Sequence, residues 1–228
     1  MNARAGGSFV GRAATAGVVG GVAFLLLGVE STVVAGSHLY RDVVWPVPWV
    51  FTMIALAGVY AAQRSALRRW GHVAFGVLAV AMSLVLLGNA GVVLDVETLK
   101  TLGFPGGAML WLVAMVPAGI ATYRAGVLPR RVGVLMAALE PLSIVTGLAL
   151  SPIAGLYDSG NYSGCLEKGI VVILIARSLR AAAAIPEVWE GLTPADGVEE
   201  SASRGGWVRI AGSPTVGNHI VHAQGELT

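Results

Sequence analysis

Two carboxylates lie inside hydrophobic stretches of this sequence, and their position makes them the first candidates for chemistry. Glu140 falls within GVLMAALEPLSIVTGLALSPIAG, and Glu30 falls within AGVVGGVAFLLLGVESTVVAG. A carboxylate at membrane depth is costly and by default suggests a function. Buried without a partner, a carboxyl group stays protonated at neutral pH and can carry a proton, because desolvation disfavours its charged form. The simpler interpretation is a neutral acid that is hydrogen-bonded to a neighbouring helix as a structural tie.

Four further polar residues complete the candidate set for an intramembrane proton relay. Ser143 shares a helix face with Glu140, and Asn89 is expected to hydrogen-bond across helices. Glu167 and Lys168 are adjacent, so they point roughly 100° apart and need not pair with each other. Lys168 would neutralise Glu30 if the first and last segments are neighbours. The favoured interpretation of this adjacent pair is two charges exposed at the membrane interface.

Known catalytic and cofactor motifs are absent from the sequence. No G-x-S-x-G, H-E-x-x-H or Walker pattern occurs, and the single Cys165 excludes an internal disulfide. His38 and His72 fall at opposite membrane ends, which argues against a haem pair. We therefore predict no cofactor and no metal, and an enzyme is disfavoured. The arginines adjoin hydrophobic segments instead of forming a separate basic face, so no nucleic-acid partner is expected.

The composition is that of a multi-pass membrane protein, with the lipid bilayer as its main partner. Hydrophobic residues make up 55% and charged residues 12% of the 228 residues, and the mean hydropathy is +0.74. Soluble domains carry about 25% charged residues. The 31 glycines are typical of membrane helices that approach one another closely. A homo-oligomer or a membrane partner protein is also considered.

We predict an all-α, polytopic transmembrane helix bundle with six spans. These spans are 16–36, 43–62, 72–94, 104–122, 133–155 and 161–184. Residues 1–15 are expected to form a cytoplasmic N-terminus and 186–228 a disordered cytoplasmic tail. A cleaved signal peptide is an alternative for residues 1–36, and the sixth span is the weakest because charges flank its short apolar run. Trp45 and Trp49 fit an interfacial aromatic belt.

The fifth segment has a small, polar face and a lipid-facing side. Helical spacing places its polar and small residues together, namely Gly133, Ala137, Glu140, Ser143, Gly147, Ser151 and Ala154. The other positions are mostly Leu, Val, Ile and Met. This face is therefore expected to contact neighbouring helices.

The arginines predict the orientation. Ten lie on the side shared by both termini, and three basic residues, Arg41, Lys100 and Lys168, lie on the other. This asymmetry places both termini in the cytoplasm and suggests the plasma membrane.

The loop YRAGVLPRR resembles a cytoplasmic loop, Arg-x-Gly-x-Leu-Pro-Arg, of uncharacterised six-helix integral membrane proteins of high-GC bacteria. NYSGCLEKG is similar to their final loop. The resemblance implies a six-helix membrane protein and no particular activity.

Two functions follow from these features. The favoured one is a non-enzymatic accessory or structural membrane protein whose polar faces only pack helices. The alternative is a small proton-linked permease or ion-conducting protein that uses Glu140 and Glu30. Convergence of the polar residues on one cavity would favour the permease, whereas a separate partner for each would favour the structural role.

Overall fold

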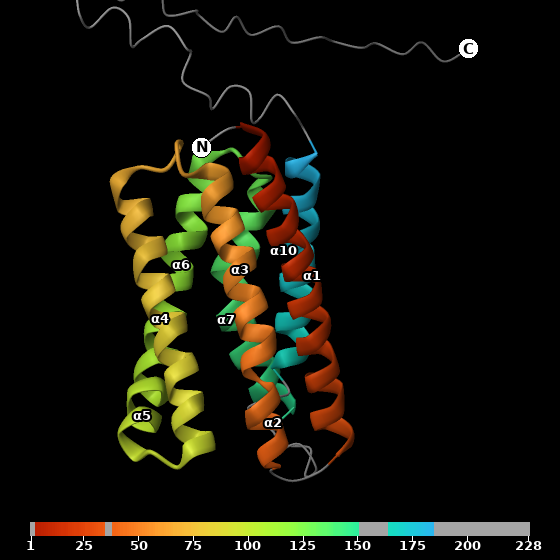
Figure 1. Ribbon diagram of the computed structural model, residues 1–228, viewed down its shortest axis with the longest axis vertical. Coiled ribbons are helices and arrows are strands. Elements are labelled where there is room, and N and C mark those ends of the chain that lie inside the picture. The colour runs from red at the N-terminus through yellow and green to blue at the C-terminus, as the bar shows by residue number, and fades with distance from the viewer. Residues whose placement is uncertain (1–2, 35–37, 151–163, 185–228) are drawn as a thin grey trace, which may run out of the picture. The chain divides into compact units, whose positions relative to one another are not determined.

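The computed structural model describes residues 3–34, 38–150 and 164–184, and these form helices joined by short turns (Figure 1). The chain divides into the units Met1–Thr193 and Pro194–Thr228, and all described residues belong to the first. The predicted tail lies outside the described residues. The elements are α1 (Ala3–Val33), α2 (Leu39–Val44), α3 (Pro46–Gln63), α4 (Arg69–Leu94), α5 (Glu97–Thr101), η1 (Leu102–Gly107), α6 (Ala108–Ala125), α7 (Arg130–Leu150) and α10 (Cys165–Ala183).

The predicted all-α bundle is confirmed. Five stretches are long and apolar enough to cross a membrane, namely Ser8–Val33, Leu39–Gln63, Arg69–Leu94, Glu97–Ala125 and Arg130–Ala149. The sixth predicted span corresponds to α10, which is not among these five and carries four charged side chains. It nevertheless packs along α1 as a full member of the bundle.

The first helix starts earlier than the sequence predicted. It begins at Ala3 instead of residue 16, and Val10, Ala13 and Ala14 are completely buried against its neighbours. Small side chains explain the extension, because they let this part of α1 lie close to another helix. This part of α1 is therefore a packed part of the bundle.

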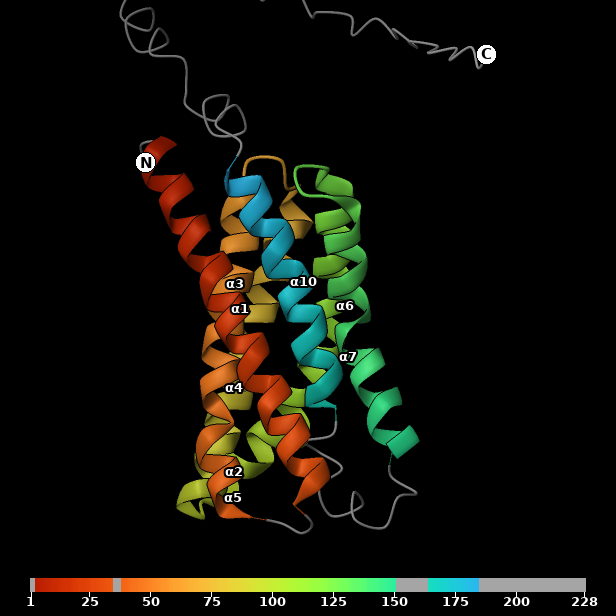
Figure 2. The ribbon, with the colours of Figure 1, turned by 90° about the vertical axis from the view of Figure 1, so that its right-hand side faces the viewer.

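The long helices form two groups of three, joined along a seam. In the first group, α1 packs against both α3 and α10; in the second, α6 packs against both α4 and α7. Between the groups, α7 meets α10 and α3 meets α4 less extensively (Figure 2). The grouping does not follow chain order, because α10 returns to complete the first group.

Pairs of glycines bring helix backbones into contact inside each group. A methyl group at Gly169 of α10 would lie 2.6 Å from the carbonyl oxygen of Gly21 in α1. A methyl group at Gly119 of α6 would lie 2.5 Å from the carbonyl oxygen of Gly133 in α7. Side chains have no room at these crossings, so each group is held together by close backbone packing.

The polar face of α7 points into the bundle, as predicted. Ser143 is buried and Glu140 is largely so, whereas Val145 and Leu148 on the opposite side are more than 60% exposed. Ser151 and Ala154 lie outside the described residues. Pro141 follows Glu140 directly and removes a helical N–H donor, which weakens the helix there. The second half of α7 leans away from the other helices (Figure 2).

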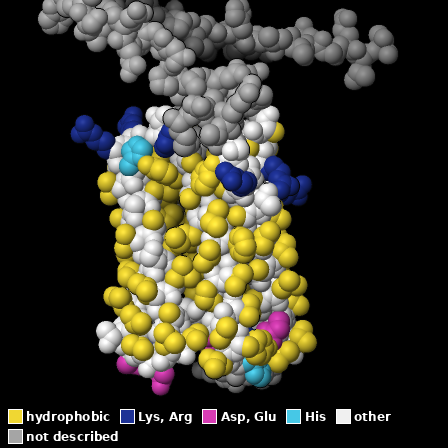
Figure 3. Space-filling view, viewed as in Figure 1, with side chains coloured by type: hydrophobic (Ala, Val, Ile, Leu, Met, Phe, Trp, Pro, Cys, Tyr) yellow, Lys and Arg dark blue, Asp and Glu magenta, His cyan; other side chains and the backbone are white. Residues whose placement is uncertain are grey.

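On the face drawn in Figure 3, charged side chains gather at the two ends of the bundle. Figure 3 shows Lys and Arg side chains at the end where α1 begins, and Asp and Glu at the opposite end. Hydrophobic side chains cover the surface between them. This distribution is that of a bundle crossing a bilayer.

Candidate functional site

The central carboxylate, Glu140, forms an ion pair with Lys168 across the seam. Lys168 Nζ donates to Glu140 Oε1 at 2.9 Å, and each side chain is 13% exposed. Glu140 comes from the middle of α7, and Lys168 comes from the first turn of α10. The pair therefore ties the α4–α6–α7 group to the α1–α3–α10 group.

This pairing corrects two expectations from the sequence. Lys168 does not neutralise Glu30, although α1 and α10 are neighbours as that prediction required. Nor is Lys168 an exposed interfacial charge. The first turn of α10 meets α7 as well as α1, and the ammonium bonds the carboxylate on the α7 side, because Glu30 already has another cation.

A cavity of about 530 Å³ lies between the two groups and contains this ion pair. It is in the half of the bundle that carries α2 and α5, away from the arginine-rich end. Its lining comes from α2, η1, the starts of α3, α6 and α10, the second half of α4 and the middle of α7. It comprises Asp42, Trp45, Trp49, Val85, Asn89, Val92, Phe104, Ala108, Trp111, Glu140 and Lys168. Its volume lies within the range of small-molecule sites, about 300–1,000 Å³.

Aromatic rings form much of the cavity wall. Trp49 of α3 and Trp111 of α6 meet edge to face across the seam, with centroids 4.8 Å apart. Trp45 lies 4.9 Å from Trp49 and 5.9 Å from Phe104. Lys168 Nζ lies 5.3 Å from the centroid of the Trp49 ring, within the range of a cation–π contact. The wall thus already accommodates one cation.

The tryptophans were not recognised as site residues from the sequence. Trp49 fitted an interfacial belt, yet it is only 3% exposed and Trp111 only 1%. Their role depends on which helices face each other. Hydropathy shows that a tryptophan is near a membrane end, but not whether it points towards lipid or towards another helix.

Several polar atoms of the site lack a hydrogen-bond partner among the described residues. They include the indole N–H groups of Trp49 and Trp111 and the second carboxylate oxygen of Glu140. Buried donors and acceptors usually find partners, since leaving one unmatched costs about 1–3 kcal/mol. These two donors and one acceptor are enclosed beside the cavity and have almost no accessible surface of their own.

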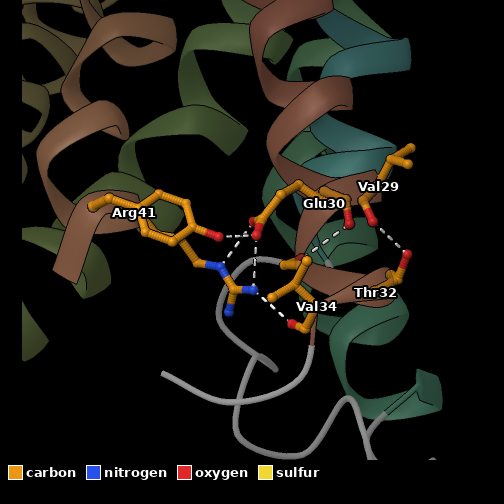
Figure 4. Close-up of polar contacts among 8 residues, drawn as sticks. Val29, Glu30, Thr32, Val34 and Arg41 are labelled. Carbon is orange, nitrogen blue, oxygen red and sulfur yellow. Dashed lines mark hydrogen bonds and ion pairs between the residues drawn. The ribbon is translucent and has the colours of Figure 1, made fainter. Parts of the chain in front are cut away.

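Glu30 lies in a separate cluster with partners of its own (Figure 4). Arg41 donates from Nε to Glu30 Oε2 at 2.8 Å and from Nη2 to Oε1 at 3.1 Å, and Tyr40 also donates to the carboxylate. Arg41 Nη2 in addition bonds the carbonyl oxygen of Val34 at 2.6 Å, and its side chain is 1% exposed. This two-bonded geometry holds the end of α1 beside α2.

The remaining predicted residues divide between the cavity and its surroundings. Asn89 lines the cavity and is 3% exposed, but it makes no hydrogen bond to another described residue, contrary to the expected interhelical bond. Ser143 donates to the carbonyl oxygen of Gly164 at 3.4 Å, just beyond the ion pair. Both Glu167 carboxylate oxygens are buried without a partner in the described chain, and they do not line the cavity.

A second polar contact crosses the seam at the arginine-rich end. Gln63 Nε2 donates to Thr122 Oγ1 at 2.8 Å, and both side chains are completely buried. Thr122 passes its own hydrogen to the carbonyl oxygen of Ala118 at 3.0 Å. Gln63 falls just after the predicted span 43–62, next to arginines, so the sequence did not predict that its side chain is buried. Each end of the seam thus has one buried polar tie.

No protein-family model, curated protein or solved structure matches this chain. Within the described residues, no group of three His, Cys, Asp or Glu side chains could hold a metal ion. The geometry of the cavity and of the seam therefore carries the functional argument.

Proposed function

We propose that this membrane protein is a small permease that binds a solute in the cavity between its two helix groups. The observation that carries the proposal is the Glu140–Lys168 ion pair, which joins the groups and lines the cavity. Three of the six candidate residues meet in this cavity, namely Glu140, Asn89 and Lys168. Polar groups placed between helix groups near membrane depth are typical of solute sites in transporters.

The construction of the bundle supports movement of one group against the other. Within the groups, glycine crossings such as Gly21–Gly169 bring the backbones together. Between the groups, side-chain contacts dominate, with Glu140–Lys168 near one end and Gln63–Thr122 near the other. If one of these two contacts broke while the other stayed formed, the two helix groups would separate at one end only. The cavity would then open to one side of the membrane at a time, as alternating access requires.

Glu140 is the residue that would link solute passage to protons. Protonation would remove its negative charge and with it the Coulombic attraction to Lys168. The released ammonium would then be available to an anionic group of a solute. Glu30 is not assigned this role, because Arg41 and Tyr40 bind its carboxylate at a distance from the cavity lining.

Glu140→Gln is expected to reduce proton entry into reconstituted vesicles to the rate of protein-free vesicles. The amide keeps the shape of the side chain but cannot take up and release the proton. Acidification is followed with a pH-sensitive dye inside the vesicles after an acid pulse. Glu97→Gln is the control, since Glu97 is an exposed carboxylate on α5 and should keep the wild-type rate. A wild-type rate in Glu140→Gln would contradict the proposal.

A non-enzymatic accessory or structural role is the second candidate. It is favoured because several buried polar groups have hydrogen-bond or ion-pair partners of their own, outside the cavity. Glu30 pairs with Arg41, and Gln63 bonds Thr122. These contacts need no solute and stabilise helix packing by themselves. If wild-type and protein-free vesicles acidify at the same rate, this role is the better description.

We further propose a plasma-membrane location with both termini in the cytoplasm, supported by the arginines at the end where α1 begins. An impermeant maleimide added to intact cells should then label Glu97→Cys and leave Arg64→Cys unlabelled. Both positions are exposed: Arg64 lies in the turn before α4, and Glu97 begins α5 just after the end of α4. The native Cys165 is buried and serves as the unlabelled background. The reverse pattern would invert the topology.

A further inference from the structure

We propose that a second cavity, between α7 and α10, binds an anionic phospholipid with its phosphate between Arg131 and Arg177. This site is separate from the cavity that contains the Glu140–Lys168 pair, and it goes beyond the proposed permease function. Its volume is about 600 Å³, and its lining comprises Arg131, Val134, Leu135, Leu174, Arg177 and Ser178. The lining combines two positive charges with an apolar surface, and a phospholipid needs both.

The cavity is open to the outer surface of the bundle. Arg131 and Arg177 are both exposed, and the side chains of Val134 and Leu174 are 55% and 41% exposed. Ser178 is buried, and its hydroxyl already donates to the carbonyl oxygen of Leu174 at 3.0 Å. Exposed valine and leucine side chains of a membrane bundle face lipid, so a molecule reaches this cavity from the bilayer.

The two arginines of the cavity have no polar partner among the described residues. Arg180, on the same helix as Arg177, donates to Thr15 Oγ1 at 3.0 Å. Arg131 and Arg177 make no such contact within the described part of the chain, and no acidic side chain lines the cavity. Two like charges that face one cavity repel each other, so an anion between them would be attracted by both.

The polar and apolar parts of the cavity follow the order of a phospholipid. α7 begins at the arginine-rich end of the bundle and α10 ends there (Figure 2). Arg131 therefore lies about 4.5 Å nearer this end than Val134, at 1.5 Å per residue. Arg177 is nearer this end than Leu174 by the same count. The charged part of the cavity thus faces the membrane surface and the apolar part faces the membrane centre, as a phosphate and its acyl chains do.

The two arginines come from different helix groups. Arg131 belongs to α7 of the α4–α6–α7 group, and Arg177 belongs to α10 of the α1–α3–α10 group. A guanidinium can bind a phosphate through two parallel hydrogen bonds, and basic pockets between membrane helices bind anionic lipid head groups. A phosphate held by both arginines would therefore link the groups on their lipid-facing side.

Two lipids with identical acyl chains test the head-group preference. Dioleoylphosphatidylglycerol is anionic, whereas dioleoylphosphatidylcholine carries no net charge. Native mass spectrometry of the full-length protein in detergent micelles measures how many molecules of each lipid bind and how tightly. We expect one phosphatidylglycerol to bind at least about tenfold more tightly than phosphatidylcholine, because its charge is not offset. Equal affinities would show ordinary surface lipid and overturn the proposal.

Substitutions of the arginines test where the lipid binds. Arg131→Gln and Arg177→Gln should each weaken phosphatidylglycerol binding by about tenfold and leave phosphatidylcholine binding unchanged. Arg130→Gln is the matched control, because Arg130 is outside the cavity lining and its guanidinium lies 5.4 Å from the centroid of the Tyr123 ring. An equal loss in Arg130→Gln would indicate diffuse attraction by the basic end and reject the site.

A further variant and a soluble competitor test the acyl-chain part of the site. Leu174→Trp places a larger side chain in the apolar half, where the partly exposed leucine leaves room for it. Phosphatidylglycerol binding should then fall to the level of phosphatidylcholine. Glycerol 3-phosphate, which has the phosphate but no acyl chain, should not displace the lipid at equal concentration.

Wild-type phosphatidylglycerol binding in Leu174→Trp, or displacement by glycerol 3-phosphate, would assign the cavity to a soluble anion and overturn the lipid. None of these measurements uses flux, so the lipid site and the proposed permease fail separately.

Discussion

Replacing Lys168 by methionine is expected to lower the stability of the bundle by about 3 kcal/mol. The variant leaves the Glu140 carboxylate largely buried, with 13% of its side chain exposed, and without its cation. Methionine matches the lysine stem in length, so the loss reflects the charge and not the packing of the chain. Unfolding in mixed micelles, followed by circular dichroism with increasing denaturing detergent, measures the change.

The double variant Glu140→Gln with Lys168→Met should recover most of this loss, because no unpaired charge remains between the groups. Lys100→Met provides the control: its partners Asp95 and Glu97 are strongly exposed, and its removal should barely change the unfolding midpoint. Wild-type stability of Lys168→Met would show that the pair does not hold the seam.

Replacing Gly169 by leucine is expected to destabilise the α1–α10 crossing by about 3 kcal/mol or more. The new side chain would begin 2.6 Å from the carbonyl oxygen of Gly21, so the two helices must separate. Losing close packing is costly in a membrane, because lipid chains cover an apolar helix surface as well as a neighbouring helix does. The same unfolding assay measures the effect, and reduced yield of folded protein is the corresponding result in expression.

Gly76→Leu is the matched control for this substitution. Gly76 lies in the long helix α4, and a methyl group built there meets no atom within 4 Å. The variant should keep the wild-type midpoint, because leucine there adds only apolar surface in a helix that tolerates it. If Gly169→Leu and Gly76→Leu behave alike, close backbone contact does not stabilise the first group.

The sequence predicted the helices and the inward face of α7 correctly for a simple physical reason. Hydrophobic stretches of membrane length must be helical, since lipid offers no partner for backbone polar groups. The spacing of Gly133, Glu140 and Ser143 then fixes which residues share a face, and the structure buries that face. These are local properties of one helix, so they can be read from its sequence.

The partners of the polar residues could not be read in the same way. Lys168 had two acids within conceivable reach, Glu30 and Glu140, and the sequence offered no means of choosing between them. In the structure, Arg41 of α2 forms an ion pair with Glu30 of α1. Lys168 therefore pairs with Glu140 instead. Which acid Lys168 binds therefore depends on how several helices, far apart in the chain, pack together.

By itself, then, the sequence determined a helical membrane bundle with an arginine-rich end and a carboxylate on the polar face of α7. Only the tertiary structure decided that α10 completes the α1–α3 group and that Glu140 faces Lys168 over a tryptophan-lined cavity. The physical reason is that helix formation follows from the composition of each segment. The assembly of helices depends instead on matching glycine crossings and polar groups between segments far apart in the chain.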